Sequence, residues 1–99
     1  ANVNIADQSG CTPLHYACMH DNIRVVQALL NAEAQVEVTD KNGNTPLHIA
    51  AQCGSRDCAV ALLLAKAEID CTNAKSFTPL HLAVLRNNKS TVELLLEKD

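Results

Sequence analysis

The stretch Thr45-Pro46-Leu47-His48 stands near the centre of this sequence, and the same four residue types return at 12–15 and at 78–81. Each copy begins 33 residues after the previous one. The match at this spacing extends beyond the motif, as in the set Asp7, Asp40 and Asn73 and the set Leu29-Leu30, Leu62-Leu63 and Leu95-Leu96. A fixed period of this size predicts a protein built from stacked, similar units.

Each copy of the motif predicts the start of a helix. Thr12 can cap a helix because its hydroxyl accepts a hydrogen bond from a free backbone N–H, and Pro13 fits the first helical position, where its missing N–H costs nothing. His15 takes the place of the Glu or Gln of a capping box. We therefore expect a first helix over about residues 13–20, with an apolar inner face at i, i+3 and i+4 spacing. In the three units that face consists of Leu14, Ala17 and Cys18, then Leu47, Ala50 and Ala51, then Leu80, Ala83 and Val84.

A turn and a second helix follow in every unit. The turns are predicted at Asp21-Asn22, Gly54-Ser55 and Asn87-Asn88, because Gly and Asn adopt left-handed backbone conformations readily. The apolar stripes of the second helices are Val25, Val26, Leu29 and Leu30, then Cys58, Ala59, Leu62 and Leu63, then Thr91, Val92, Leu95 and Leu96. The alternating stretch Val36-Glu37-Val38 and the turn residues 40–43 predict a short β-hairpin. One helix pair cannot bury both of its faces, so the units must stack.

This arrangement resembles the ankyrin repeat family, because helix, turn, helix and β-turn recur every 33 residues with the motif T-P-L-H-x-A. The resemblance covers the whole chain. It implies an all-α solenoid with β-turn or hairpin loops, forming a single domain over residues 1–99. We place the repeats at about 7–39, 40–72 and 73–99, after the tail of an earlier repeat at 1–6, and we expect the chain to be part of a longer array.

The resemblance also assigns the histidines of the motif. In this family the Thr and the His make structural hydrogen bonds near the loop and between adjacent units, so His15, His48 and His81 are expected to be structural. The sequence departs from the family where Gly normally ends the second helix, and the residues found there are Glu33, Lys66 and Asp99. A residue with a side chain in a left-handed helix cap costs about 1 kcal/mol, so we expect either that the loop relaxes or that the domain is less stable than a consensus array.

Composition and charge narrow the function classes. The 99 residues carry a net charge of -3 with a pI near 5.7, so the bulk electrostatics do not favour nucleic-acid binding. No apolar run is long enough to insert into a membrane, and the first residues do not resemble a signal peptide. The five cysteines are odd in number and form no C-x-x-C pair. We therefore expect a reducing compartment, cytoplasmic or nuclear, rather than a disulfide framework.

Residues that could carry chemistry are present but lack the arrangement that chemistry needs. Cys11, His15 and Cys18 have metal-like spacing, but a structural zinc site needs four converging ligands and His15 is already assigned to a cap. Cys53 and His20 have no orienting group or oxyanion hole that would make them a nucleophilic pair. The three glycines all punctuate turns, which argues against a phosphate-binding loop. We expect no enzymatic activity, no metal, no cofactor and no small-molecule substrate.

Asn4 allows two interpretations. It lies in a Val-Asn loop that, through the family resemblance, is similar to substrates of asparaginyl hydroxylation, whereas the other units carry Glu37 and Asp70 at this position. In the alternative interpretation, which is favoured, Asn4 only makes a hydrogen bond across the loop.

The favoured function is that of a protein–protein interaction module. The resemblance places its binding site on the concave face, which consists of the turn tips and the exposed ends of the first helices. The partner-binding residues expected on this face are Gln8, Ser9, Cys11, Met19, His20, Lys41, Asn42, Asn44, Gln52, Cys53, Ala74, Lys75, Phe77, Leu85 and Arg86. The set contains cations and large apolar side chains but no carboxylate, so we expect a partner protein or peptide with acidic residues beside a hydrophobic anchor. The alternative is a structural spacer segment of a larger multidomain ankyrin-repeat protein.

Overall fold

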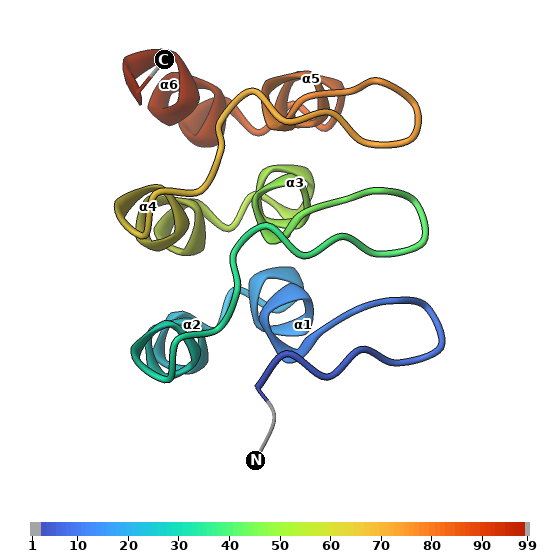
Figure 1. The fold of residues 1–99 in the computed structure, drawn as a ribbon. Coiled ribbons are helices and arrows are strands. Elements are labelled where there is room, and N and C mark those ends of the chain that lie inside the picture. The colour runs from blue at the N-terminus through green and yellow to red at the C-terminus, as the bar shows by residue number, and fades with distance from the viewer. Residues whose placement is uncertain (1–2, 99) are drawn as a thin grey trace.

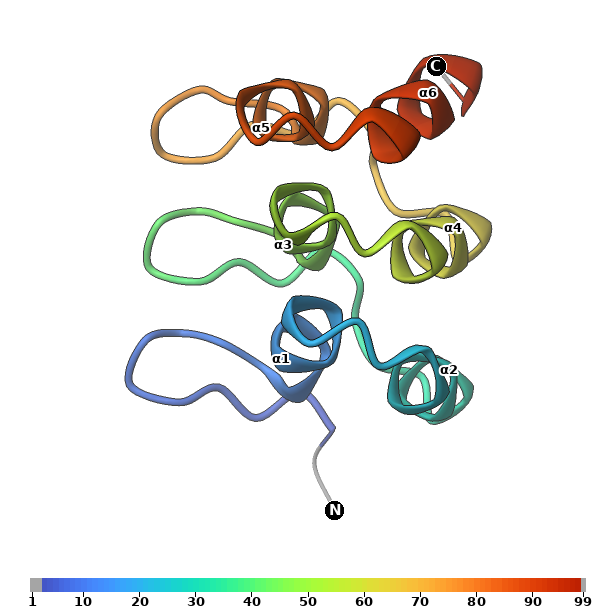
Figure 2. The same cartoon turned by 180° about the vertical axis from the view of Figure 1, so that it is seen from behind.

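The computed structural model describes residues 3–98, which form three stacked helix pairs. The helices are α1 (Pro13–Met19), α2 (Ile23–Asn31), α3 (Pro46–Cys53), α4 (Arg56–Leu64), α5 (Pro79–Leu85) and α6 (Lys89–Lys98). In Figure 1, α1, α3 and α5 form one column, α2, α4 and α6 form a second, and three loops project beyond the first column. Figure 2 shows the same two columns from behind. The predicted all-α solenoid is confirmed, and none of the described helices is long and apolar enough to cross a bilayer.

We call residues 7–39, 40–72 and 73–98 repeats 1, 2 and 3, and the projecting loops that begin them loops 1, 2 and 3. The turn predicted at residues 40–43 is confirmed, since Gly43 N–H donates to the Asp40 carbonyl at 3.0 Å. The hairpin strands predicted around it are wrong, because residues 3–98 contain no strand. The loop backbones instead bond to the loop of the neighbouring repeat. Lys41 N–H donates to the Ser9 carbonyl at 3.0 Å, and Ala74 N–H donates to the Asn42 carbonyl at 2.9 Å.

The histidine of each motif closes a capping box, as predicted. In repeat 2, Thr45 N–H donates to His48 Nδ1 at 3.1 Å, and Pro46 occupies the first helical position. Because Nδ1 accepts, the ring proton is on Nε2, and this atom donates to the Phe77 carbonyl of repeat 3 at 2.8 Å. His15 makes the same bond to the Asn44 carbonyl at 2.9 Å. These bonds confirm the structural role predicted for His15 and His48.

The turns between paired helices also connect neighbouring repeats. Asp21, Gly54 and Asn87 adopt left-handed conformations, with φ of 54°, 73° and 58°, as the turn residues predict. Ser55 and Asn88 directly follow the left-handed residues Gly54 and Asn87, and the side chain of each donates a hydrogen bond to the preceding repeat. Ser55 Oγ donates to the Cys18 carbonyl at 2.7 Å, and Asn88 Nδ2 donates to the Ala51 carbonyl at 2.8 Å. These bonds join the last turns of α1 and α3 to the repeat that follows each of them.

The core lies between the two columns and between successive repeats. It is built mainly of Leu, Ala and Cys side chains, including Leu14, Cys18, Leu47, Cys58 and Leu62, and small residues allow the helices to approach closely. No buried side-chain nitrogen or oxygen in the described part of the chain lacks a partner.

Three residues assigned to the apolar faces are exposed, so these assignments are wrong. Val25 is 41% exposed, Val84 59% and Leu96 58%. Each of these residues lies at an end of the described stack, where no neighbouring repeat within residues 3–98 covers it. The equivalent residues of other repeats do contact a neighbouring repeat. Cys58, the equivalent of Val25, contacts Asp21 of repeat 1 at 3.6 Å. In α6 the residue buried next to Leu95 is Leu94 instead.

The second helices end in the left-handed conformation that the family usually assigns to Gly. Glu33 has φ of 65° and Lys66 has φ of 69°. The loops therefore do not relax to accommodate these side chains, and the expected strain is present at both positions. The third residue of this set, Asp99, and the first two residues of the N-terminal tail, Ala1 and Asn2, lie outside the described residues.

Candidate functional site

Eight of the predicted partner-binding residues line one cavity of about 330 Å³ between repeats 2 and 3. We call this cavity the repeat 2–3 groove. Its lining consists of the predicted residues Asn42, Asn44, Gln52, Ala74, Lys75, Phe77, Leu85 and Arg86, together with Asn73 and Leu82. The last two were missed, because the pattern Asp7, Asp40, Asn73 indicates only a turn residue and the position of Leu82 in α5 indicates only a core residue.

The loop that carries the groove residues of repeat 3 is fixed by Asn73. Its side-chain oxygen accepts from Lys75 N–H at 2.9 Å and from Phe77 N–H at 3.0 Å, which closes the turn. The neighbouring loop holds it from the other side through the bond from Ala74 N–H to Asn42. Leu85 and Arg86 come from the last turn of α5, so the groove is formed by segments held on two sides by hydrogen bonds.

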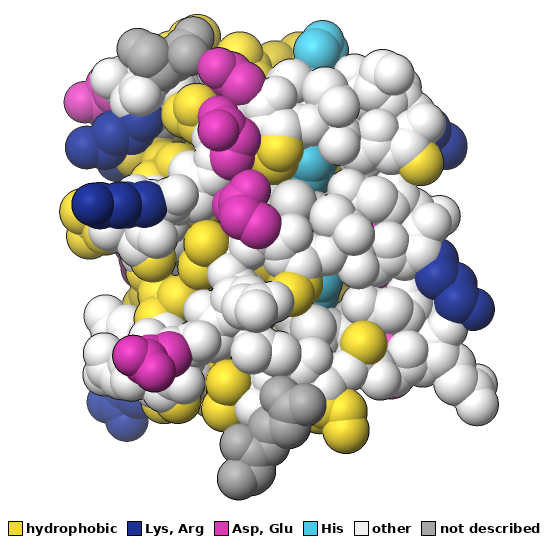
Figure 3. All heavy atoms as spheres, in the orientation of Figure 1, with side chains coloured by type: hydrophobic (Ala, Val, Ile, Leu, Met, Phe, Trp, Pro, Cys, Tyr) yellow, Lys and Arg dark blue, Asp and Glu magenta, His cyan; other side chains and the backbone are white. Residues whose placement is uncertain are grey.

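The lining of the groove carries positive charge and no carboxylate. Lys75 and Arg86 are both exposed, and the other polar lining residues are amides. Figure 3 shows carboxylates gathered in a row over the segments that connect successive repeats, away from the projecting loops. The exposed acidic residues in these segments include Glu37, Glu68 and Asp70. A net acidic chain therefore presents a locally basic surface at the repeat 2–3 groove.

Phe77 and Leu85 stand between the groove and a second hollow. This hollow has a volume of about 310 Å³ and is lined by Phe77, Thr78, Leu80, His81, Val84 and Leu85. Phe77 is half-buried, with its ring centroid 5.8 Å from that of His81, whereas Leu85 is 63% exposed. Large apolar side chains thus lie directly beside the two cations.

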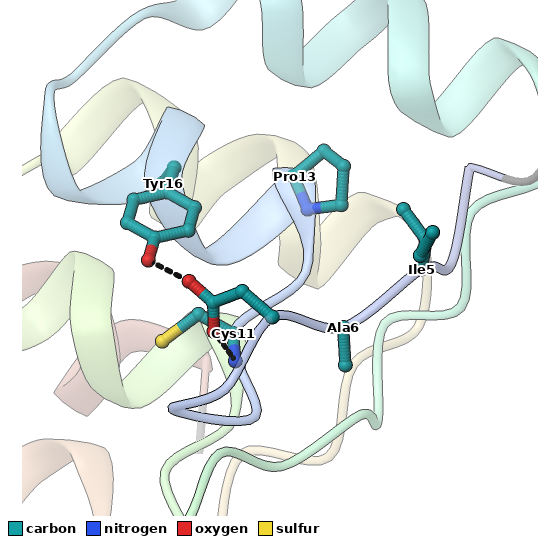
Figure 4. Close-up of a pocket in the computed structure, with 6 residues that line it drawn as sticks. Ile5, Ala6, Cys11, Pro13 and Tyr16 are labelled. Carbon is teal, nitrogen blue, oxygen red and sulfur yellow. Dashed lines mark hydrogen bonds between the residues drawn. The ribbon is translucent and has the colours of Figure 1, made fainter.

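The other predicted residues lie outside this groove. Gln8, Ser9, Met19, His20, Lys41 and Cys53 are exposed on loops 1 and 2 and at the ends of α1 and α3. Cys11 instead lines a different cavity, of about 430 Å³, together with Ile5, Ala6, Asp7, Pro13 and Tyr16. The Tyr16 hydroxyl, labelled in Figure 4, donates a hydrogen bond to the carboxylate of Asp7. This bond raises the pKa of Tyr16 to about 12 and lowers the pKa of Asp7, so the polar groups of that cavity satisfy each other.

The described residues do not assemble a metal site or an activated thiol. No group of three His, Cys, Asp or Glu side chains in residues 3–98 is placed to hold a metal ion. Burial raises the pKa of every cysteine thiol, to about 12 for Cys58, which disfavours the reactive thiolate. Cys71 Sγ lies 3.9 Å from His48 Nδ1, but this nitrogen already accepts the Thr45 N–H and is not free to act as a base.

Asn4 makes the predicted hydrogen bond across the loop. Its side-chain oxygen accepts from Gln35 N–H at 2.8 Å. Glu37, one repeat later, accepts from Glu68 N–H at 3.0 Å through the equivalent contact. The hydrogen bond expected of Asn4 is therefore confirmed, and the choice between the two interpretations of this residue stays a prediction.

Comparisons with known proteins agree with this architecture. A family model described as ankyrin repeats (3 copies) matches residues 1–73 and, in a second match, residues 38–99. Among curated proteins, the chain is similar to the Ankyrin repeat and LEM domain-containing protein 1 homolog of Caenorhabditis elegans, with 63% identity over 30 residues. The matched segment is 30% of this chain and 4% of the relative, so the chain spans only a small part of the relative's length.

Proposed function

Because the chain belongs to the ankyrin repeat family, whose members are generally non-enzymatic protein–protein interaction modules, we propose that it binds a partner protein or peptide through its concave face. This face comprises the loop tips and the C-terminal ends of α1, α3 and α5. The observation that carries the proposal is the repeat 2–3 groove, where loop tips and helix ends line one cavity. The groove combines apolar area from Phe77, Leu82 and Leu85 with convergent polar groups that can orient a ligand.

The partner, in our proposal, has acidic residues beside a hydrophobic anchor. Lys75 and Arg86 supply positive charge to the groove without a carboxylate in its lining, and Lys41 is exposed on the adjacent loop. Phe77 and Leu85 supply apolar area beside these cations. Complementary charge speeds the encounter of two proteins, whereas buried apolar anchors slow their separation.

A pair of exposed alanines provides the test. Ala74 lies at the tip of loop 3 and Ala28 lies on α2, and both are exposed. A photoreactive amino acid is placed at either position in the full-length protein, in its own cells, and crosslinked proteins are identified by mass spectrometry. We expect a partner that is crosslinked from position 74 and not from position 28. Equal crosslinking from both positions contradicts the concave face, and none from position 74 favours the spacer function.

We also propose that the three repeats lie within a longer array. His81 makes the cap bonds of the motif, but within residues 3–98 its Nε2 atom meets no carbonyl group like those bound by His15 and His48. The apolar hollow around Leu80 and Val84 lies on the same end of the stack. A further repeat would supply both the carbonyl group and the apolar cover.

A further inference from the structure

The same turn position holds a carboxylate in two repeats and an amide in the third. Asp7, Asp40 and Asn73 all use one side-chain oxygen to accept two backbone N–H groups of their turn. The distances are 2.9 and 3.0 Å for Asp7, 2.9 and 2.9 Å for Asp40, and 2.9 and 3.0 Å for Asn73. The turn therefore needs one oxygen atom and no charge, so Asn73 is not explained by the turn alone.

The amide of Asn73 has a second effect, which a carboxylate could not have. Its Nδ2 donates to the side-chain oxygen of Asn44 at 2.8 Å, across the wall of the repeat 2–3 groove. This bond fixes the orientation of the Asn44 amide, and the N–H₂ group of that side chain, which bonds no protein atom within residues 3–98, is left to a ligand. Together with Lys75 and Arg86, Asn44 gives the groove three side chains that can donate hydrogen bonds to a ligand.

The equivalent positions between repeats 1 and 2 carry a carboxylate and lack the two cations of the groove. Asp40 replaces Asn73 there, and Asn42 and Cys53 replace Lys75 and Arg86. The charge of Asp40 reaches the preceding loop, since it contributes after burial to raising the pKa of Cys11, the counterpart of Asn44. A carboxylate at the position of Asp40 or Asn73 therefore exerts a negative electrostatic potential on the residue at the position of Cys11 or Asn44 in the preceding loop.

We propose that the repeat 2–3 groove binds a carboxylate of an Asp or Glu side chain of the partner protein, and that Asn73 is the specificity-determining residue. The inference rests on the proposed function, because the ligand is a part of the same partner. Asn73 closes the turn without placing a negative charge beside the ligand, and it orients the Asn44 amide as a donor. Hydrogen bonds from cations and amides to a carboxylate are stronger than those to a neutral amide, which gives the groove its selectivity.

Two capped tetrapeptides test the selectivity. The probe is acetyl-Glu-Glu-Leu-Phe-amide, and the control is its neutral isostere acetyl-Gln-Gln-Leu-Phe-amide. Each is titrated into the chain at low salt, and backbone amide shifts are followed by NMR. We expect shifts at Asn44, Asn73 and Lys75, and binding of the acidic peptide roughly tenfold tighter than that of the neutral one.

Three variants make the assignment specific. Asn73→Asp keeps the turn bonds, as Asp7 and Asp40 do, and is expected to abolish the preference for the acidic peptide. Lys75→Asn combined with Arg86→Gln leaves Asn73 intact and is expected to reduce the same preference. The matched control, Asp40→Asn, makes the opposite exchange at the equivalent position of repeat 2 and leaves the preference unchanged.

Several outcomes would overturn the inference. Equal affinity of the wild type for both peptides contradicts a carboxylate site, and a preference that survives Asn73→Asp contradicts the role of this residue. Shifts that centre on Ser9, Met19 and His20 rule out this groove but leave the concave face as a binding surface. If neither peptide causes shifts, the carboxylate groove is wrong, and the crosslinking from Ala74 decides the broader function separately.

Discussion

His48 donates a hydrogen bond from Nε2 to the carbonyl oxygen of Phe77, 29 residues further along the chain, at 2.8 Å. Nδ1 of the same ring accepts the N–H of Thr45 and so caps α3. The Phe77 carbonyl also accepts from Asn73 N–H at 2.9 Å, within the turn that carries the groove. One buried imidazole therefore joins the start of a helix in repeat 2 to the loop of repeat 3 that forms the candidate binding site.

Replacing this imidazole should destabilise the whole domain. His48→Ala removes the cap and the bond to Phe77 and leaves a cavity at a fully buried position, so we expect a loss of about 3 kcal/mol in the free energy of unfolding. His81→Ala is the control, because His81 is exposed and its hydrogen bonds within residues 3–98 are those of the cap alone, so its loss should be about 1 kcal/mol. Urea denaturation of both variants measures the difference. Equal losses would show that the bond to the next repeat contributes nothing.

The stability of the domain should fall in mild acid. Burial lowers the pKa of His48 below its ordinary value of 6.5, so the unfolded chain binds a proton at a higher pH than the folded one. The contribution of this group is complete above about pH 6.5 and is lost as the pH falls toward the folded pKa, by at most about 1.4 kcal/mol per pH unit. Urea unfolding of the wild type and of His48→Gln at a series of pH values isolates the effect. If the free energy of unfolding changes with pH equally in the wild type and in His48→Gln, His48 does not contribute to the acid sensitivity.

A glycine should stabilise the end of α4. Lys66 has φ of 69°, a conformation that costs about 1 kcal/mol for a residue with a side chain. Lys66→Gly should therefore raise the free energy of unfolding, although the greater freedom of glycine in the unfolded chain reduces the gain. Lys66→Ala removes the same charge without relieving the backbone and should give no gain. A thermal melt distinguishes the two variants, and equal midpoints would mean that the strain is compensated locally.

An added repeat should satisfy His81. A copy of residues 34–66 fused after Asp99 continues the register of the array and presents the carbonyl of a second Asn44 to the Nε2 atom of His81. Each additional interface stabilises a repeat protein, so the thermal midpoint should rise. The same fusion with His81→Ala should gain less. An unchanged midpoint would contradict the proposal that this end of the stack accepts another repeat.

Charge reversal on two faces tests the chemistry of the partner found by crosslinking. Lys41, Lys75 and Arg86 changed to Glu should slow association, most strongly at low salt, because these side chains attract an acidic surface. Reversal of Arg24, Lys66 and Lys98, which lie on the second helices and after α4, changes the net charge equally and should have little effect. Phe77→Ala should instead speed dissociation. Surface plasmon resonance separates the two rates. If both triple reversals weaken binding equally, the overall charge and not the concave face is responsible.

Local patterns in the sequence predict much of this structure, because each repeat contains its own signals. Thr45, Pro46 and His48 indicate a capped helix by their order alone, and Gly54 indicates a left-handed turn. Val25 and Leu96, at the ends of the stack, were wrongly predicted to be buried. An apolar residue type does not reveal whether a neighbouring repeat covers the side chain. Asn73 was assigned to a turn only. Its contact with Asn44 depends on how two loops lie in space, which the spacing within one repeat does not encode.

The bond between His48 and Phe77 also bears on how the chain folds. Both histidine bonds between repeats span 29 residues, and the bonds made by Ser55 and Asn88 span 37. Each interface therefore closes a chain segment of similar and moderate length, and the entropy lost on closure is nearly the same for every repeat. Because these bonds reach only the neighbouring repeat, one formed repeat can serve as the template for the next. Repeat 2 takes part in both interfaces, so the order of assembly depends on which of its two neighbours docks first.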